Sequence, residues 1–312
     1  MRTLSTALTF AALAACGAPA APRAPAVAPI TVTPYAAAES NVNAYVVSDG
    51  QGAIVIDATR NPTDGAALAA LVAQRTTGPV TVLITHGHPD HFLGLGALRA
   101  ALPDARFVVV RPEIKADIIG MATWMTAQGW LAQLPAMQPR TADHPDGFDY
   151  AGQLEVLDAP TLTLPGGAAL ALTADYPATE AEHMTTAYSA DANALFTGDL
   201  AYHDVHLWLG VGVTRASAAA WQTGLDGLGA TWAARRPTVY PGHGAPTDTA
   251  VFAADRAYID DILAVTAAAP SDEAAIAEMA EKYPDHANRE FLLMMSVSNL
   301  RAMRPIIARP PS

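Results

Sequence analysis

From about residue 31, the chain alternates between short apolar runs and segments whose apolar residues have helical spacing. Two strand-like runs flank the turn dipeptide Asp49-Gly50, which predicts a β-hairpin over residues 43–57. Further runs rich in Leu, Val, Thr and Ala predict strands at residues 80–84, 107–110, 153–158, 161–164, 168–174, 185–188 and 193–197. Helices are predicted at residues 64–76, 92–101, 214–228, 249–268, 271–283 and 287–303. Because strand-rich halves each end in helices, we expect sheets covered by helices on their outer faces.

One helical segment is unusually rich in Met and Trp. Residues 113–139 carry, among others, Met121, Trp124 and Trp130. Large apolar side chains at helical spacing are more often core than a ligand surface, so we expect most of them to be buried. The functional alternative is a lid over a cleft, in which residues 118–137 form an apolar wall.

The first thirty residues predict export and a lipid anchor. Residues 1–15 have a short basic start and an apolar run of signal-peptide length, too short to span a bilayer. The run ends in Ala14-Ala15-Cys16-Gly17, which resembles the bacterial lipobox, where the cysteine is lipidated and becomes the new first residue. The alternative is an ordinary signal peptide cut at a nearby alanine. Residues 16–30 are Ala/Pro-rich and predict an extended tether. Gly17, where an aspartate would favour inner-membrane retention, predicts outer-membrane anchoring facing the periplasm in a Gram-negative cell.

Composition excludes several classes of protein. Of the 312 residues, 51% are apolar and 15% are charged, which excludes a disordered chain. Lys plus Arg number 18 against 30 Asp plus Glu, and a net charge of −12 makes nucleic acid an unsuitable partner. The single cysteine excludes disulfides and a thiolate-rich zinc knuckle, so the 9 histidines must carry any metal chemistry.

The strongest chemical signal is a histidine cluster. The predicted strand 80–84 runs into Thr85-His86-Gly87-His88-Pro89-Asp90-His91. Imidazole and carboxylate are good ligands for Zn²⁺ and similar ions, and a structural role hardly explains this density of them. In an irregular loop, His86 and His88 can face one ion while Asp90 and His91 face a second.

Three further motifs at predicted strand ends complete a pattern. They are Glu182-His183, Gly198-Asp199 and Pro241-Gly242-His243-Gly244. In the order HxHxDH, H, GD and GHG, residues 31–265 resemble the metallo-β-lactamase-fold superfamily of metallohydrolases. The resemblance implies an α+β fold, a four-layer αβ/βα sandwich with a two-metal site at one edge of the paired sheets, followed by C-terminal helices in residues 266–312.

The resemblance also implies a ligand set. It assigns His86, His88 and His183 to a first metal, Asp90, His91 and His243 to a second, and Asp199 as the bridge between two divalent ions, with Zn²⁺ favoured. Met184 and Glu182 flank His183 where the family usually has small residues and Gly, so Glu182 or Glu180 is the alternative ligand. Asp57 matches an aspartate that recurs near the family's site and is expected to orient a ligand or close a turn.

The implied chemistry is hydrolysis of an ester, lactone, thioester or amide by a metal-bridging hydroxide, with Asp90 holding the nucleophile or passing a proton to the leaving group. Asp199 and the absence of a free thiol in the mature chain resemble the glyoxalase II-type thioester hydrolases and lactonases, which disfavours a β-lactam substrate. With no basic patch for an acidic thiol cofactor, a neutral or apolar ester or lactone is the expected small-molecule partner. The predicted lipid is the only expected contact with a membrane.

For the residues that follow Asp199, the sequence leaves two roles open. Tyr202 has the spacing of the tyrosine that assists the reacting carbonyl in quorum-quenching lactonases, or it packs in the loop with Trp208. His203 and His206 line the substrate pocket, or they are solvated or core histidines. The alternatives to a binuclear hydrolase are a one-iron enzyme of the persulfide dioxygenase type, a β-lactam hydrolase and a non-enzymatic metal-binding lipoprotein.

Overall fold

The computed structural model describes residues 29–303. The predicted signal peptide, Cys16 and most of the predicted tether lie outside the described residues, so export and lipidation stay predictions. No helix within residues 29–303 is both long and apolar enough to cross a membrane.

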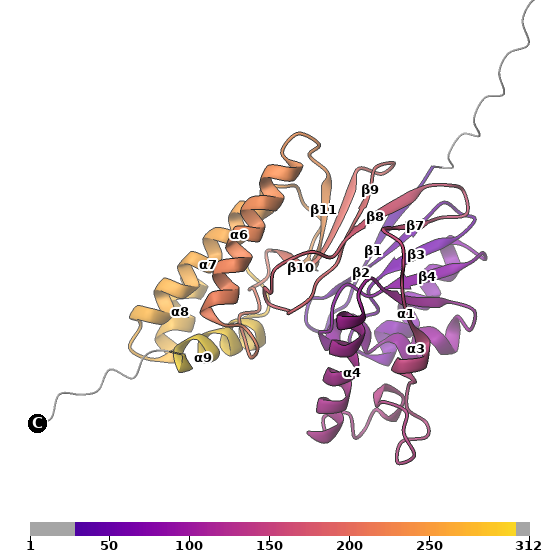
Figure 1. The fold of residues 1–312 in the computed structure, drawn as a ribbon. Coiled ribbons are helices and arrows are strands. Elements are labelled where there is room, and N and C mark those ends of the chain that lie inside the picture. The colour runs from indigo at the N-terminus through magenta and orange to yellow at the C-terminus, as the bar shows by residue number, and fades with distance from the viewer. Residues whose placement is uncertain (1–28, 304–312) are drawn as a thin grey trace, which may run out of the picture.

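Two β-sheets form the middle of the molecule (Figure 1). The first sheet has the order β1-β2-β3-β4-β5-β6, with bounds Thr31–Ala36, Asn43–Ser48, Ala53–Ile56, Val80–Leu83, Arg106–Val109 and Leu154–Val156. The second has the order β11-β10-β9-β8-β7; in chain order from β7 its strands are Thr161–Thr163, Ala169–Thr173, Thr186–Ser189, Ala194–His203 and Thr238–Gly244. Strands β3 to β6 pair in parallel, as do β10 and β11, and the remaining pairs are antiparallel.

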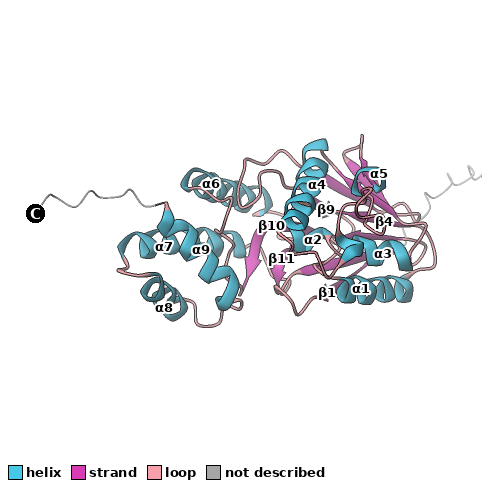
Figure 2. Cartoon of the chain, turned by 90° about the horizontal axis from the view of Figure 1, so that it is seen from below, coloured by secondary structure: helices cyan, strands magenta, loops and turns pink. Residues whose placement is uncertain are grey.

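Helices cover the outer face of each sheet (Figures 1 and 2). On the first sheet lie α1 (Pro62–Arg75), α2 (Pro89–Phe92), α3 (Leu95–Ala101), α4 (Pro112–Ala127) and α5 (Tyr150–Gln153), with a 3₁₀ turn at Pro135–Met137. On the second lie α6 (Arg215–Trp232), α7 (Val251–Ala268), α8 (Asp272–Lys282), a π-helical turn at Arg289–Leu293 and α9 (Met294–Ala302). The expected four-layer sandwich with C-terminal helices is therefore confirmed.

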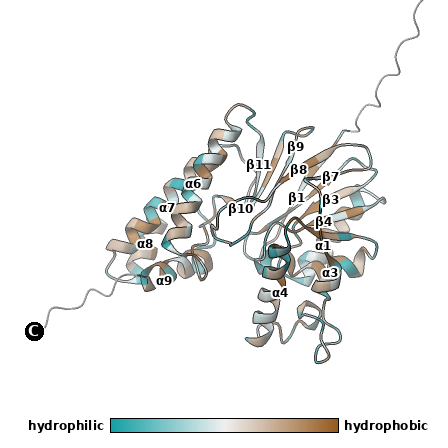
Figure 3. Cartoon of the chain, in the orientation of Figure 1, coloured by the Kyte–Doolittle hydropathy of each residue, from teal (hydrophilic) through white to brown (hydrophobic). Residues whose placement is uncertain are grey.

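Three apolar clusters hold these layers together. One lies between the sheets and includes Leu83, Val108 and Phe196; the others pack the helices on the outer faces, around Phe107 and Trp221. In Figure 3 the strands β3 and β4 are strongly hydrophobic, whereas α6 to α9 mix hydrophobic and hydrophilic residues. This difference follows from burial, because the inner strands are covered on both faces and the helices on only one.

The predicted hairpin is present between β2 and β3. The Asp49 carboxylate accepts hydrogen bonds from the N–H groups of Gln51 and Gly52, which fixes the turn. The predicted N-terminus of α8 is also present, since the Ser271 hydroxyl accepts a hydrogen bond from the N–H of Ala274.

Strand β10 is longer than the sequence pattern indicates. It continues through Asp199 to His203, with two register shifts against β11 between Phe196 and Tyr202. Gly198 has a φ of 51°, a left-handed conformation that suits the bulge. Side chains of the covering helices satisfy backbone groups in this stretch: Asp255 accepts from the N–H of Tyr202, and the Trp221 indole donates to the carbonyl of Leu200. Contacts with distant helices thus keep the irregular stretch in the sheet.

The Met- and Trp-rich segment is only partly core. Met125 and Leu131 are buried, but Trp124 and Trp130 are 45% and 61% exposed. The expectation that most large side chains of this segment are buried therefore fails for the largest of them, because Trp124 and Trp130 line a pocket instead.

Candidate metal centre

The ends of several strands meet at one place in the fold. Asp57 follows β3, His86 and its neighbours follow the parallel strand β4, and Asp199 and His243 lie on β10 and β11. Glu180 comes from the irregular segment between β8 and β9. The carboxyl ends of parallel strands lie at the same edge of a sheet, which is why motifs far apart in the sequence converge here.

Two groups of metal-ligating side chains form at this edge. The first consists of His86, His88, Glu180 and Asp199; the second consists of Asp90, His91 and His243. Within each group, the ligand atoms all lie within 4.8 Å of one another. Most of the seven side chains are buried, and His88 and Asp90 are the two that are only partly buried.

Asp199 lies between the two groups. Its carboxylate oxygens are 3.6 Å from Nε2 of His86, 3.1 Å from Nε2 of His91 and 3.2 Å from Nε2 of His243. Glu180 Oε1 is 3.4 Å from Nε2 of His86 and 3.1 Å from Nδ1 of His88. The Asp199 carboxylate thus lies close to imidazoles of both groups, whereas the Glu180 carboxylate lies close only to imidazoles of the first group.

Several atoms of the site are buried without a hydrogen-bond partner. They are Nε2 of His86, Nε2 of His91, Oε1 of Glu180 and Oδ1 of Asp199. Burying a polar atom without a partner costs about 1–3 kcal/mol, and native structures rarely tolerate several in one place. Metal coordination satisfies such atoms, and the mixture of imidazole and carboxylate suits Zn²⁺ or a similar ion. The residues present therefore fit a pair of divalent ions.

The opposite nitrogen of three imidazoles is already occupied. Nδ1 of His91 hydrogen bonds to Asp57 at 2.8 Å, Nδ1 of His86 lies 2.9 Å from the hydroxyl of Thr85, and Nδ1 of His243 lies 2.9 Å from the carbonyl of Ser40. Such contacts fix the ring orientation and leave Nε2 free for a metal. Asp57 also accepts from the N–H and hydroxyl of Thr85, so one carboxylate supports both His86 and His91.

Close packing explains why a glycine occupies the middle position of the Pro241-Gly242-His243 motif. A Cβ at Gly242 would lie 1.8 Å from Oδ1 of Asp199. The backbone of β11 therefore approaches the central carboxylate more closely than any side chain allows.

Burial and neighbouring charges shift the pKa values of the clustered side chains in different directions. Burial alone would raise the pKa of Asp199, but the imidazoles of His91 and His243 lower its pKa well below the usual value. Burial disfavours a charged imidazole at His88, yet the adjoining Glu180 raises the pKa of His88 to about 9. Burial and the neighbouring His91 lower the pKa of His86 well below 6.5. Because metal ligands must be deprotonated, an ion binding here has to displace protons from this cluster.

The structure does not bring His183 into either ligand group. Its ring lies outside both groups, and Nδ1 of His183 is 2.8 Å from Oδ2 of Asp117 on α4. Glu180, three residues earlier, is buried and belongs to the first group. Glu180 is one of the two alternatives that the sequence offers; the other, Glu182, is also outside the groups. The structure brings the other predicted ligands together in the two groups.

Tyr202 lies at the site, and its hydroxyl is occupied. The hydroxyl lies 2.9 Å from Oδ2 of Asp199 and 3.0 Å from Oε2 of Glu180, and its ring stacks on His243 with centroids 4.7 Å apart. Burial and the charge of Asp199 raise the pKa of Tyr202 well above 10. The hydroxyl therefore keeps its proton and donates a hydrogen bond to a carboxylate.

The two histidines after Tyr202 are not among the residues that line the pocket described below. Nδ1 of His203 lies 2.9 Å from the carbonyl of Ala245. His206 is buried against the C-terminal helices, where Nδ1 lies 2.9 Å from the hydroxyl of Tyr258 and the ring lies 5.5 Å from that of His286. The structure therefore does not bring either histidine to the pocket, and His206 matches the alternative of a core histidine.

Buried His206 makes stability depend on pH. Burial, with a smaller effect of His286, lowers the pKa of His206 to about 4. An unfolded chain has a histidine pKa near 6.5, so between about pH 6.5 and 4 the unfolded state binds a proton that the folded state does not. The stability contributed by neutral His206 is complete above this window and is lost as the pH falls, by up to about 1.4 kcal/mol per pH unit. We expect His206→Gln to flatten the fall in melting temperature between pH 7 and 4.5, measured by calorimetry.

The matched control for this measurement is His144→Gln, because His144 lies outside the contacts of His206 with Tyr258 and His286. A His206→Gln variant whose melting temperature falls as steeply as that of the wild type would contradict the assignment.

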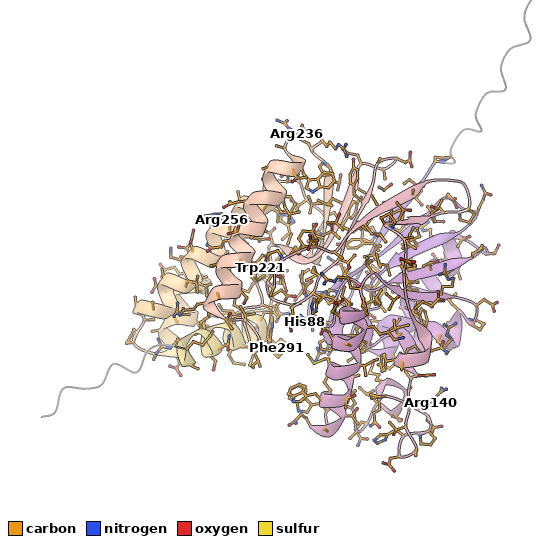
Figure 4. The ribbon with its side chains drawn as sticks, viewed as in Figure 1. His88, Arg140, Trp221, Arg236, Arg256 and Phe291 are labelled. Atoms are coloured by element: carbon orange, nitrogen blue, oxygen red, sulfur yellow. The ribbon has the colours of Figure 1, made fainter. Side chains whose placement is uncertain are left out.

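The two metal-ligating groups open onto one pocket of about 600 Å³. His88, Asp90, Glu180, Asp199 and His243 lie at its polar end, together with Tyr202. The rest of its lining is mostly apolar and comes largely from α4 and the residues after it, from the segment between β10 and α6, and from the π-helical turn and α9. Figure 4 labels His88 and Phe291, two of the residues that line the pocket.

Solved structures with a similar fold exist. A metallo-beta-lactamase family protein from Thermus thermophilus has 18% identity and a TM-score of 0.58, covering 87% of this chain and 91% of its own. A beta-lactamase domain protein from Burkholderia ambifaria also has 18% identity and a TM-score of 0.58, with 90% and 88% covered. A sec-alkylsulfatase from Pseudomonas has 16% identity and a TM-score of 0.54, covering 84% of this chain but 47% of its own. No curated protein matches the chain.

The family model of the metallo-beta-lactamase superfamily matches residues 37–243, about two thirds of the chain, including all seven side chains of the two groups. With the two-sheet sandwich and the metal-ligating groups at its edge, this match shows that the chain belongs to the metallo-beta-lactamase superfamily.

Proposed function

We propose that this protein is a binuclear metal-dependent hydrolase that cleaves an ester, lactone or related acyl bond. The observation that carries the proposal is the pair of adjoining ligand groups, whose buried donor atoms lack partners and open onto a pocket. A purely structural ion would not need a pocket of substrate size beside it.

Two divalent ions bound there, with zinc favoured, would supply a hydroxide nucleophile and polarise the reacting carbonyl. Asp90 lines the pocket, with Oδ2 3.6 Å from Nε2 of His243, and is the residue that we expect to hold the nucleophile or carry a proton to the leaving group. Tyr202 retains its proton and lines the same pocket, so it is the candidate donor to the substrate's acyl oxygen.

A second candidate is hydrolysis of an alkyl sulfate ester. The fold is shared with a protein described as a sec-alkylsulfatase, and the mostly apolar pocket beside the ligand groups suits an alkyl group. A β-lactam and a one-iron oxidation of a persulfide are the remaining alternatives, and seven ligand side chains are more than a single iron needs.

The test is the metal content of the protein purified without chelators, followed by a substrate panel. We expect about two equivalents of zinc or another divalent ion per chain, because there are two ligand groups. The panel contains carboxylic esters, lactones, alkyl sulfates and a β-lactam. Chelation should abolish the hydrolysis that is found, and adding the metal back should restore it.

One equivalent of iron with no second ion would overturn the binuclear mechanism. Cleavage of alkyl sulfates without cleavage of any carboxylic ester would favour the second candidate.

A further inference from the structure

The pocket has a polar end and two apolar walls. One wall comes from α4 and the residues after it and includes Met121, Trp124 and Trp130. The second wall comes from the segment after β10 and from the π-helical turn, and it includes Trp208 and Phe291. Residues of both ligand groups line the same pocket as the two walls, so a molecule reacting at these groups can contact the walls.

Each wall carries a pair of aromatic rings. Trp124 and Trp130 meet edge to face with centroids 4.8 Å apart, and Trp208 stacks with Phe291 at 5.7 Å. Aromatic rings provide large, rigid apolar contact areas with little loss of conformational entropy. Two such pairs facing one pocket form walls suited to a flat or flexible hydrocarbon.

Large apolar side chains are exposed mainly around this pocket. Within residues 29–303 there are seven exposed large hydrophobic residues, and Trp124, Trp130, Val211 and Phe291 of these line the pocket. Exposed apolar groups scattered singly need no explanation, whereas a contiguous set marks a binding surface.

The pocket offers no unpaired cation to an anionic tail. Among the lining residues in the described part of the chain, Arg60 is the only Lys or Arg, and its Nε lies 2.9 Å from Glu39. The carboxylates of Asp90, Glu180 and Asp199 are confined to the polar end. The walls therefore favour an uncharged group over an anionic one.

We propose that the two walls bind the long, uncharged alkyl or acyl chain of the substrate, with its reacting ester at the ligand groups. The proposal rests on the proposed function and names its substrate class. It makes Trp208 and Phe291 specificity residues, although they lie outside the ligand motifs.

Chain length should then set the rate. Burying one methylene contributes about 0.8 kcal/mol, which corresponds to about a fourfold increase in kcat/KM for each added carbon until the pocket is full. We expect kcat/KM to rise over a series of straight-chain esters from acetate to decanoate with one common alcohol. Phe291→Ala and Trp130→Ala should each lower kcat/KM for decanoate about tenfold and change that for acetate less than twofold.

Trp232→Ala is the matched control, since Trp232 packs on Tyr188 with centroids 4.4 Å apart, outside the pocket. It should leave the dependence on chain length unchanged. Binding of linear alcohols from butanol to decanol, followed by calorimetry, provides a readout that requires no hydrolysis.

The two proposals fail in different ways. If no ester is cleaved but decanol binds more tightly than butanol, and Phe291→Ala removes the difference, the apolar walls are supported and the hydrolase is not. If esters are cleaved at rates independent of chain length and the alcohols bind equally, the hydrolase stands and this inference is overturned.

Discussion

Replacing Asp199 by asparagine should lower kcat by about a thousandfold or more and reduce the bound metal below two equivalents per chain. Asp199 is the carboxylate that approaches both ligand groups, within 3.6 Å of the Nε2 atoms of His86, His91 and His243. Asparagine keeps the shape but removes the negative charge that two adjoining cations require. Loss of one electrostatic contact to a developing charge costs about 100- to 1000-fold in a hydrolase, and we expect a larger loss here because Asp199 approaches both ligand groups.

The measurement is kcat on the best panel substrate together with metal per chain by elemental analysis. Asp226→Asn provides the control, because it makes the same chemical change at an exposed carboxylate paired with Arg256 at 3.1 Å. Circular dichroism of both variants separates loss of function from loss of fold. Full metal content and wild-type kcat in Asp199→Asn would show that the residue does not bridge the ions.

Much of the site could be predicted from sequence because its motifs are local. His86, His88, Asp90 and His91 lie within six residues at the end of one strand, so their proximity needs no tertiary information. Asp199 and His243 follow predicted strands, and the resemblance to the metallo-β-lactamase-fold superfamily is what implied that they join this cluster.

Glu180 could not be preferred over His183 from the residues alone. Both lie in an irregular segment, where no periodicity fixes which side chains point inward. The choice is made by packing: Asp117 on α4 pairs with His183, while Glu180 is buried beside His86 and His88. The resemblance to the superfamily pattern assigned His183, because this histidine precedes the Gly198-Asp199 motif, and left Glu180 and Glu182 as alternatives.

The composition of the pocket walls could not be predicted from the sequence pattern either. Trp208 and Phe291 lie far apart in the chain, and only the packing of the π-helical turn against the segment after β10 brings them into contact. Similarly, the sequence made His206 a candidate pocket residue because it follows Asp199 closely. The backbone bridge from the adjacent Val205 to Ala287 and the hydroxyl of Tyr258 instead hold it among the C-terminal helices.

Glu180→Gln and His183→Gln form a pair of variants that separates the two ligand assignments. We expect Glu180→Gln to lose about one metal equivalent per chain and to lower kcat about a hundredfold or more, because the first group then keeps only His86, His88 and the shared Asp199. His183→Gln should keep two equivalents and lower kcat less than tenfold, since it breaks only the contact with Asp117. Elemental analysis and kcat on the same substrate measure both.

The opposite result would carry a definite meaning. Loss of one equivalent in His183→Gln, with both retained in Glu180→Gln, would require the segment between β8 and β9 to turn His183 inward when ions bind. That movement would have to break the 2.8 Å contact with Asp117 and expose the Glu180 carboxylate. It would also remove the partner that the Tyr202 hydroxyl has in Glu180 at 3.0 Å. A glutamate that is buried beside two imidazoles without a partner for Oε1 is explained more simply as a ligand.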